Sequence, residues 1–305
     1  MTIGIGKNPE TGKKTQQIET FPDGRQITTK YDDQERVVQT INDNLQGDGT
    51  KVTTDFNPET GKKTQEVTEN ERNKTVQTIT YDENENWVTD ITVDNSKVPV
   101  ERTEKYNEAD GIRTDKYQGD TLIRRTKGNL DIQYINGGRI ETLTNDDGSQ
   151  EIRKYDAREG GKLLEEKIIN KDGSYTETIN TYDGNKLVKT VSSSYGPSPD
   201  NKLISEVTTE GTTVIKREVQ DDGTIKETKT ENGTKVSETI YAADGKTKVS
   251  ETSYEGDKTT ERTFNTDGSL KSEVIKENGV TTTKSYDEHG KLLSEVTVDS
   301  NKNTT

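Results

Sequence analysis

Cysteine is absent from this chain of 305 residues, and histidine, tryptophan and methionine each occur once. Without cysteine no disulfide can staple the fold, and the redox compartment in which the protein works is not indicated. Any Ser/His/Asp catalytic arrangement would have to use the one histidine, His289.

Apolar residues are also scarce. Hydrophobic residues make up 24% of the chain and aromatic residues 5%, whereas charged residues make up 33%. Ordinary globular domains are roughly 45–50% apolar, so a compact core of ordinary size is not available. This composition approaches that of disordered chains. The regular turns and β-branched segments of the chain nevertheless favour an ordered sheet that is one layer thick or thinly packed.

No apolar run is long enough to span a membrane, and residues 1–7 lack the apolar core of a secretory signal. We therefore expect no signal peptide; work outside a cell would require another route or prior processing. The net charge of −14 repels nucleic acid and anionic membranes and favours solubility. Nucleic acid is thus not expected as a partner.

Residues 221–298 contain turn signals at a regular interval. Seven glycines follow one another at spacings of 10 to 12 residues. They lie in Asp222-Gly223, Asn232-Gly233, Asp244-Gly245, Glu255-Gly256, Asp267-Gly268, Asn278-Gly279 and His289-Gly290. Asp-Gly and Asn-Gly favour a type I′ hairpin turn, whose two central residues both need positive φ. The segments between the turns are rich in Thr, Val, Ile and Tyr, which suits β-strands.

Every second segment is similar, because Ser-Glu-Val or Ser-Glu-Thr recurs along the chain. The motif begins at Ser205, Ser237, Ser250, Ser272 and Ser294, and the last two steps are 22 residues each. A hairpin of this size cannot bury an apolar face alone, so neighbouring hairpins must stack. We predict an all-β fold: a long antiparallel β-meander of repeated hairpins in a thin or single-layer twisted sheet. An open ribbon and a spiral shell are both compatible with this pattern.

A longer repeat occupies the first hundred residues. Asn8–Gln16 recurs unchanged as Asn57–Gln65, and Tyr31-Asp32 recurs as Tyr81-Asp82, at offsets of 49 and 50 residues. An offset of this size is two hairpins, so we expect the same architecture with longer turns. Residues 162–170 would suit a helix by composition, but they lie on the hairpin interval and are predicted to form a strand.

Only one segment clearly interrupts the hairpins. Residues 192–201 are rich in Ser and Pro, which favours a long loop or hinge. We therefore divide the chain into a hairpin-repeat region with longer turns at 1–191, the loop or hinge at 192–201, and a regular hairpin-repeat region at 202–305. The polar tail at 299–305 is expected to fray or to contact a partner.

Three segments that begin with Tyr-Asp, at Tyr81, Tyr182 and Tyr286, resemble the YD repeat of the Rhs family. In that repeat Tyr-Asp is followed by a glycine, a basic residue and a leucine. The chain is also similar to the short Asn-Gly-Lys repeats of MORN-like bacterial proteins. The resemblance implies strand-turn-strand architecture and an association with phage or injection machinery. It carries over no active site.

Two segments invite a catalytic or phosphate-binding interpretation. His289 lies in the turn Asp287–Gly290 without a strand-turn-helix nucleophile elbow, so we interpret it as an exposed turn residue. The segment Gly6–Thr15 is similar to a P-loop, but five residues separate Gly6 from Gly12, whereas the motif requires four. We interpret this segment as a repeated turn.

Three acidic turns could offer oxygen ligands to calcium. They are Asn107–Gly111, Asn145–Gly148 and Gln220–Gly223. None has the full alternating ligand pattern followed by a downstream Glu. Ordinary turn chemistry is therefore the favoured interpretation, and we predict neither a metal site nor a cofactor.

The sequence contains a few residues that could bind a sugar or a phosphate group. Trp87 could stack on a sugar, but its position in a strand favours packing. The basic cluster Arg124–Lys127 is interpreted as an exposed strand face rather than a phosphate site. A glycosidase needs two carboxylates at a set separation, and none stands out among 57 Asp and Glu residues. We predict no catalytic residue and leave ligand-binding residues open.

The sequence favours a non-enzymatic structural protein. It would be a fibre, spacer or shell component of a larger assembly, such as a phage tail or injection-system appendage, located in a virion or an extracellular appendage. Its partners would be other protein subunits, including copies of itself. One alternative is a surface adhesin or receptor-binding module whose specificity, for example for a glycan, lies in the longer turns 44–49 and 192–201. A second alternative is a polysaccharide-cleaving spike.

Overall fold

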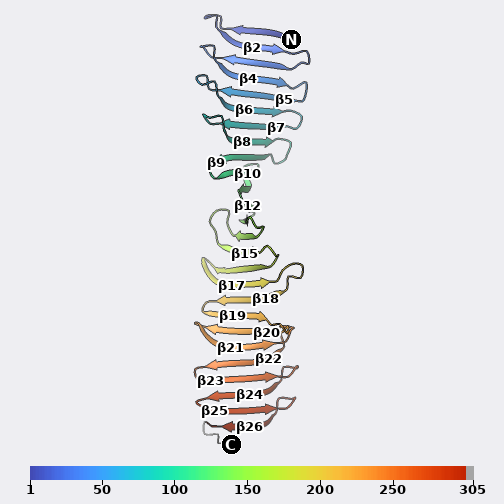
Figure 1. Cartoon of the computed structure of the whole chain (residues 1–305), viewed down its shortest axis with the longest axis vertical. Helices are drawn as coiled ribbons and strands as arrows, with labels where there is room; N and C mark the ends of the chain where they lie inside the picture. The colour runs from blue at the N-terminus through green and yellow to red at the C-terminus, as the bar shows by residue number, and fades with distance from the viewer. Residues whose placement is uncertain (300–305) are drawn as a thin grey trace. The chain divides into compact units, whose positions relative to one another are not determined.

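The computed structural model describes residues 1–299, which form 26 β-strands and no helix (Figure 1). The all-β prediction is therefore confirmed, and residues 300–305 of the predicted polar tail lie outside the described range. No helix that could cross a membrane occurs in this part of the chain. The chain divides into two compact units, Met1–Leu143 and Thr144–Thr305.

Unit 1 contains β1 (Thr2–Lys7), β2 (Lys14–Thr20), β3 (Gln26–Tyr31), β4 (Val37–Asn44), β5 (Thr50–Phe56), β6 (Lys63–Asn70), β7 (Thr75–Tyr81), β8 (Trp87–Asp94), β9 (Glu101–Glu108), β10 (Gly111–Gln118), β11 (Thr121–Lys127), β12 (Leu130–Ile135) and β13 (Gly138–Thr144). Unit 2 contains β14 (Gln150–Tyr155), β15 (Leu163–Ile169), β16 (Tyr175–Asp183), β17 (Lys186–Tyr195), β18 (Leu203–Glu210), β19 (Thr213–Val219), β20 (Ile225–Glu231), β21 (Thr234–Tyr241), β22 (Lys248–Glu255), β23 (Lys258–Phe264), β24 (Leu270–Glu277), β25 (Val280–Tyr286) and β26 (Leu292–Val298). The segment 162–170 forms strand β15, as predicted.

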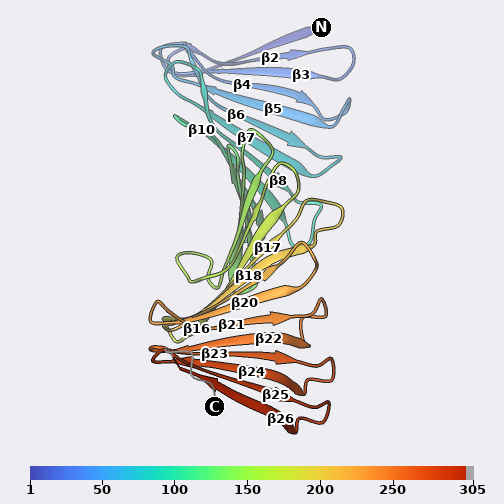
Figure 2. The same cartoon turned by 60° about the horizontal axis from the view of Figure 1, so that its bottom comes forward.

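Each unit is a β-meander in which every strand pairs antiparallel with the next strand along the chain. Figure 2 shows β20 to β26 following one another across unit 2, each joined to the next by a short turn. Among the described residues, strands contact only their sequence neighbours, and β1 and β26 each pair with one strand. Each unit is therefore an open single-layer sheet rather than a closed shell.

A hydrophobic core is missing from residues 1–299, where no apolar side chain is buried. The buried side chains are polar, and they are Thr54, Asp115, Ser193, Thr239 and Thr260. The low apolar content of the sequence correctly predicted this. Backbone ladders and cross-strand side-chain pairs must hold the sheet, each pair contributing roughly 0.2–1 kcal/mol.

A row of paired charges runs along one face of unit 2. The strand registers place Glu206, Arg217, Glu227, Thr239, Glu251, Arg262 and Glu273 in one line across β18 to β24. Arg217 Nε lies 2.7 Å from a Glu227 oxygen, and Arg262 Nε lies 2.9 Å from a Glu273 oxygen. Thr239, with 3% of its surface exposed, lies between Glu227 and Glu251 in this line, where the row has a threonine instead of an arginine. The Glu-Arg-Glu pattern therefore recurs every four strands.

In each copy of the 49-residue repeat of unit 1, a lysine contacts a tyrosine ring and thereby connects two turns. In the first copy the Lys14 ammonium lies 4.0 Å from the centre of the Tyr31 ring, and the Glu35 carboxylate accepts the Lys14 backbone N–H at 2.8 Å. In the second copy Lys63 lies 5.2 Å from the ring centre of Tyr81. These cation–π contacts explain why the lysine segment and the Tyr-Asp segment recur at nearly the same offset.

The turns of residues 221–298 fall into three types, which corrects the single type predicted. Asn232-Gly233 and Asn278-Gly279 have positive φ at both residues, as a type I′ turn requires. In the Asp-Gly turns at Gly148, Gly173, Gly223, Gly245 and Gly268, only the glycine has positive φ. Its N–H bonds the carbonyl three residues back, which is a type I turn followed by a left-handed glycine. The turn predicted at Glu255-Gly256 lies one residue later, at Gly256-Asp257. Its glycine comes first, as in type II′ turns.

The physical reason for the Asp-Gly correction is the aspartate side chain. Asp147 accepts the backbone N–H of Ser149 at 2.9 Å and its hydroxyl at 2.7 Å. The same pair of bonds joins Asp172 to Ser174, Asp222 to Thr224 and Asp267 to Ser269. An aspartate that is fixed to the backbone two residues ahead favours a right-handed turn conformation for itself. The left-handed position then moves to the glycine alone.

The predicted interruption at 192–201 is shorter in the structure. Residues 192–195 belong to β17, where Thr178 and Thr176 hydroxyls bond Ser192 and Ser194 at 3.1 Å and 3.2 Å. Serine hydroxyls can pair across strands, so a Ser-rich segment need not be a loop. Residues 196–202 connect β17 to β18, and a domain boundary there stays a prediction.

Replacing Gly233 by alanine should lower the free energy of unfolding by about 1–2 kcal/mol, because an L-residue is strained in the left-handed region that φ of +79° requires. Gly4→Ala is the control, since Gly4 lies in β1 with no heavy atom within 4 Å of an added Cβ. Urea denaturation should show a lower free energy of unfolding for Gly233→Ala only. An equal decrease in both variants would contradict the assignment of a type I′ turn at Gly233.

Acid should weaken the aspartate turns. Bonds from the Thr247 hydroxyl, then from the backbone N–H groups of Thr247 and Lys246, lower the pKa of Asp244 to about 2. A depressed folded-state pKa contributes stability that is complete above the unfolded value, 3.8, and is lost as the pH falls through about 2. NMR titration of the Asp244 carboxyl carbon should show Thr247→Val raising this pKa and Thr247→Ser preserving it.

Candidate functional site: the ion-pair network on strands β9 to β11

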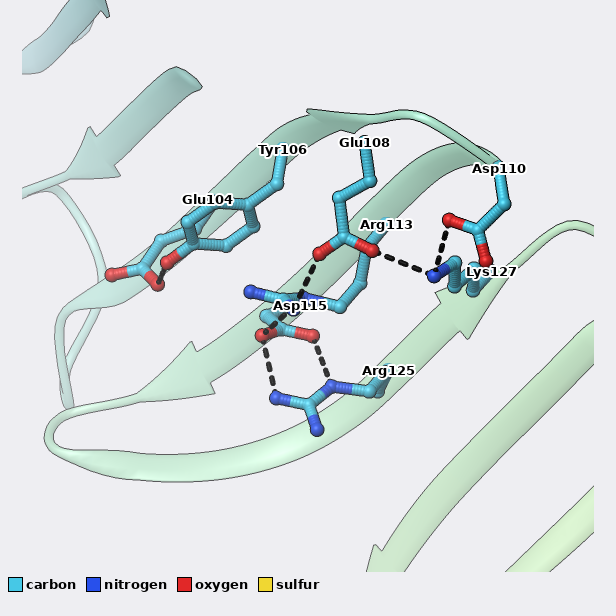
Figure 3. A network of polar contacts seen from close by, with 8 residues as sticks. All are labelled: Glu104, Tyr106, Glu108, Asp110, Arg113, Asp115, Arg125 and Lys127. Atoms are coloured by element: carbon cyan, nitrogen blue, oxygen red, sulfur yellow. Dashed lines mark hydrogen bonds and ion pairs between the residues drawn. The ribbon is translucent and has the colours of Figure 1, made fainter. Parts of the chain in front are cut away.

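Asp115 is the most buried large side chain of the described residues, with 1% of its surface exposed. It lies in the middle of β10, and the registers place Glu104 of β9 and Arg125 of β11 directly beside it. Because antiparallel neighbours present opposed residues on one face, these three side chains meet on the same side of the sheet (Figure 3).

Arg125 holds Asp115 with two parallel hydrogen bonds. Its Nε lies 2.7 Å from Oδ1 and its Nη2 lies 2.8 Å from Oδ2, and Arg113 Nε approaches Oδ2 at 3.4 Å from the same strand as the aspartate. The hydrogen bonds from Arg125 to Asp115 raise the pKa of the guanidinium. A bidentate arginine is the geometry that best offsets the cost of burying a carboxylate.

A second set of pairs surrounds Glu108 at the β9–β10 turn. Its two oxygens accept bonds from Arg113 Nη1 at 2.6 Å and from Lys127 Nζ at 2.7 Å. Lys127 also lies 2.7 Å from an Asp110 oxygen, and these two acidic partners raise the pKa of the lysine. Figure 3 shows the pairs joining all three strands.

Aromatic rings complete the network. The Tyr106 hydroxyl donates to Glu104 at 2.6 Å, which raises the pKa of Tyr106, and the Arg113 guanidinium lies 4.1 Å from the centre of that ring. Arg102 lies 4.2 Å from the ring centre of Tyr117. Arginine over an aromatic face adds attraction where water is partly excluded.

The network is built to hold strands together. Arginine and lysine donors occupy the oxygens of Glu108 and Asp115, so these carboxylates act as fixed hydrogen-bond acceptors between the strands. No motif in the sequence predicts this network. Asp115 is one of many acidic residues, and its partner is recognised only once the register between β10 and β11 is known.

The basic cluster Arg124–Lys127 is divided between the two faces of β11. Arg125 and Lys127 belong to the network, whereas Arg124 forms two bonds with Asp131 on the other face, at 2.9 Å and 2.7 Å. Each cation is paired within the sheet. The cluster therefore contributes to ion pairs on both faces of β11.

The segment Gly6–Thr15 forms a hairpin turn. Asn8 Oδ1 accepts the backbone N–H groups of Glu10 and Thr11 at 2.9 Å and 3.2 Å, and no helix follows. The second copy repeats both distances around Asn57. This geometry supports the interpretation as a repeated turn.

The acidic turns and the single histidine are separate features. Asp147 and Asp222 bond their own turns, and residues 1–299 contain no cluster of three metal-binding side chains. His289 is 79% exposed, and its backbone N–H bonds Asp287 at 2.9 Å.

Trp87 is half-buried at the start of β8, opposite Tyr81.

Comparisons with known proteins add little. No family model and no curated protein matches the chain. Among solved structures, a porin-like protein from Bacteroides uniformis is 9% identical over 76% of this chain and 88% of its own, with a TM-score of 0.17. The structures of TcdB2-TccC3-Cdc42 and TcdB2-TccC3 are each 12% identical with TM-scores of 0.19, over 96% and 90% of this chain. The chain spans only 19% and 20% of their lengths, and these likenesses carry no functional argument.

Replacing Arg125 by methionine should lower the free energy of unfolding by about 2–3 kcal/mol, because Asp115 would stay buried without its two bonds from Arg125, with only the 3.4 Å contact to Arg113 left. This loss is below that of a fully buried pair, since 35% of the Arg125 side chain is exposed. Arg124→Met is the matched control on the opposite face and should cost less than about 1 kcal/mol.

Urea denaturation measures both variants. The double variant Asp115→Leu/Arg125→Met should recover most of the loss, because it removes the buried charge as well. Equal losses for Arg124→Met and Arg125→Met would show that the network does not stabilise these strands.

Proposed function

We propose that the chain is a non-enzymatic structural repeat protein that serves as a spacer or shell component within a larger protein assembly. The observation that carries the proposal is the pairing pattern: each described strand pairs only with its sequence neighbours. Every added hairpin therefore lengthens a unit by about 10 Å, two strands at about 4.8 Å each. A sequence built in this way sets a length through its number of repeats.

The side-chain contacts support the same function. The Glu-Arg-Glu row of unit 2 and the lysine–tyrosine contacts of unit 1 stabilise a sheet that has no core. Such a sheet leaves both faces available to other subunits. Exposed apolar residues such as Ile112 and Ile204, at 50% and 51%, occur in both units.

The particular assembly is proposed from the sequence resemblance. The YD-like segments favour an association with phage or injection machinery, in a virion or an extracellular appendage, with other protein subunits as partners. One observation favours the receptor-binding alternative, a hollow beside the turn 44–49.

Deleting residues 250–271 should shorten the protein without unfolding it. Ser272 then takes the place of Ser250, and both lie in one row, since Ser250 opposes Thr263 and Thr263 opposes Ser272. Solution X-ray scattering should show a maximum dimension smaller by about 10 Å, and circular dichroism should show a retained β-sheet spectrum.

The control deletes residues 250–270, which leaves one extra residue and turns the following side chains to the opposite face. It should destabilise the strands after the junction. If the 250–271 deletion folds and the maximum dimension is unchanged, repeat number does not set length and the spacer function is wrong.

A further inference from the structure

A hollow of about 480 Å³ lies at one edge of unit 1, beside the turns that follow β4, β6 and β8. Its lining includes Leu45, Lys51, Glu69, Lys74, Val76 and Asn95. The volume falls within the range of small-molecule sites, roughly 300–1,000 Å³. Leu45 belongs to the turn 44–49, which the sequence singled out for its length.

The rim of this hollow is fixed by bonds between successive turns. The Glu71 N–H donates to the Gly49 carbonyl and the Asn95 N–H donates to the Lys74 carbonyl, each at 2.9 Å. The Arg72 guanidinium also donates to the Gly47 carbonyl. Three turns that are far apart in the sequence are thereby held in one arrangement, so the hollow is formed before any ligand arrives.

Gly49 makes the contact between Arg72 and the turn 44–49 possible. Its φ is +83°, and an added Cβ would lie 2.7 Å from Cγ of Arg72. Only glycine allows the arginine stem to lie against the turn while its guanidinium reaches the Gly47 carbonyl. The glycine therefore serves the contact between turns as well as the turn itself.

The lining combines a small apolar surface with polar groups of balanced charge. Leu45 and Val76 are half-buried apolar side chains, and Lys51 is paired with Glu69 at 3.1 Å. Lys74 and Asn95 are exposed, and neither side chain bonds another described residue.

This combination suits a ligand with an apolar ring face and many hydroxyl groups. Hydroxyls can both donate and accept, so they match ammonium, carboxylate and amide groups together. An anionic ligand would meet Glu69 as well as the lysines. A purely apolar ligand would leave the polar groups without partners.

We propose that the hollow beside the turn 44–49 binds a neutral sugar unit of a glycan. Leu45 and Val76 contact the C–H face of the ring, and Lys74, Asn95 and the Lys51–Glu69 pair bond its hydroxyls. This binding does not depend on the spacer function, because it uses one edge of unit 1 and leaves the strand pairing unchanged.

The test is NMR titration of the full chain with glucose, galactose, mannose and N-acetylglucosamine, each as the free sugar. We expect at least one sugar to shift the backbone amides of residues 45, 69–76 and 95, with millimolar affinity. Val76→Arg fills the hollow and should weaken this binding at least about tenfold, the equivalent of about 1.4 kcal/mol.

Val214→Arg is the matched control, since Val214 is likewise a half-buried valine in the second position of an inner strand. It should leave sugar binding unchanged. Absence of shifts with all four sugars would overturn the proposal, as would shifts that persist in Val76→Arg or that map to other turns. Circular dichroism of both variants separates loss of the hollow from loss of the fold.

Discussion

Cross-strand register is the constraint on which the rest of this structure depends. No apolar side chain of residues 1–299 is buried, so a strand cannot be positioned by fitting into a core. It is positioned by the backbone ladder and by the residues that lie opposite it. A slip of one residue would move every side chain to the other face. It would also remove the pairing of Arg217 with Glu227 and of Arg125 with Asp115. Charge pairing and turn chemistry thus select the same register.

Much of the fold could be predicted from the sequence because its signals are local and repeated. The glycine spacing, the Ser-Glu motif and the two copies of Asn8–Gln16 each indicate where the chain turns. Turn type was predicted less well. Asp and Asn before glycine look equivalent in a sequence. However, Asp147 bonds the backbone and hydroxyl of Ser149, whereas Asn232 adopts the left-handed conformation itself. The prediction of a loop at Ser192 to Ser194 is wrong for a similar reason, since serine suits both loops and hydroxyl pairs.

The candidate sites are less predictable from the sequence than the strands and turns, because they depend on contacts between strands. Asp115 and Arg125 lie ten residues apart, and they face each other only through the pairing of β10 with β11. With 57 acidic residues in the chain, the sequence alone offers no way to select this one. The hollow beside Leu45 likewise requires three turns to be brought together. The length of the turn 44–49 indicates one part of the hollow, but no sequence pattern predicts the bonds from the N–H groups of Glu71 and Asn95.

Neighbour-only pairing has a mechanical consequence. If a unit is held by its first and last strands and pulled apart, the same tension passes through every strand pair, because the pairs are connected in series. The weakest strand pair therefore opens first, and the remaining pairs stay closed until the tension exceeds their own strength. Because each strand is stabilised mainly by its two neighbours, the strands still paired retain their structure. They also provide the template on which released strands can pair again when the tension falls.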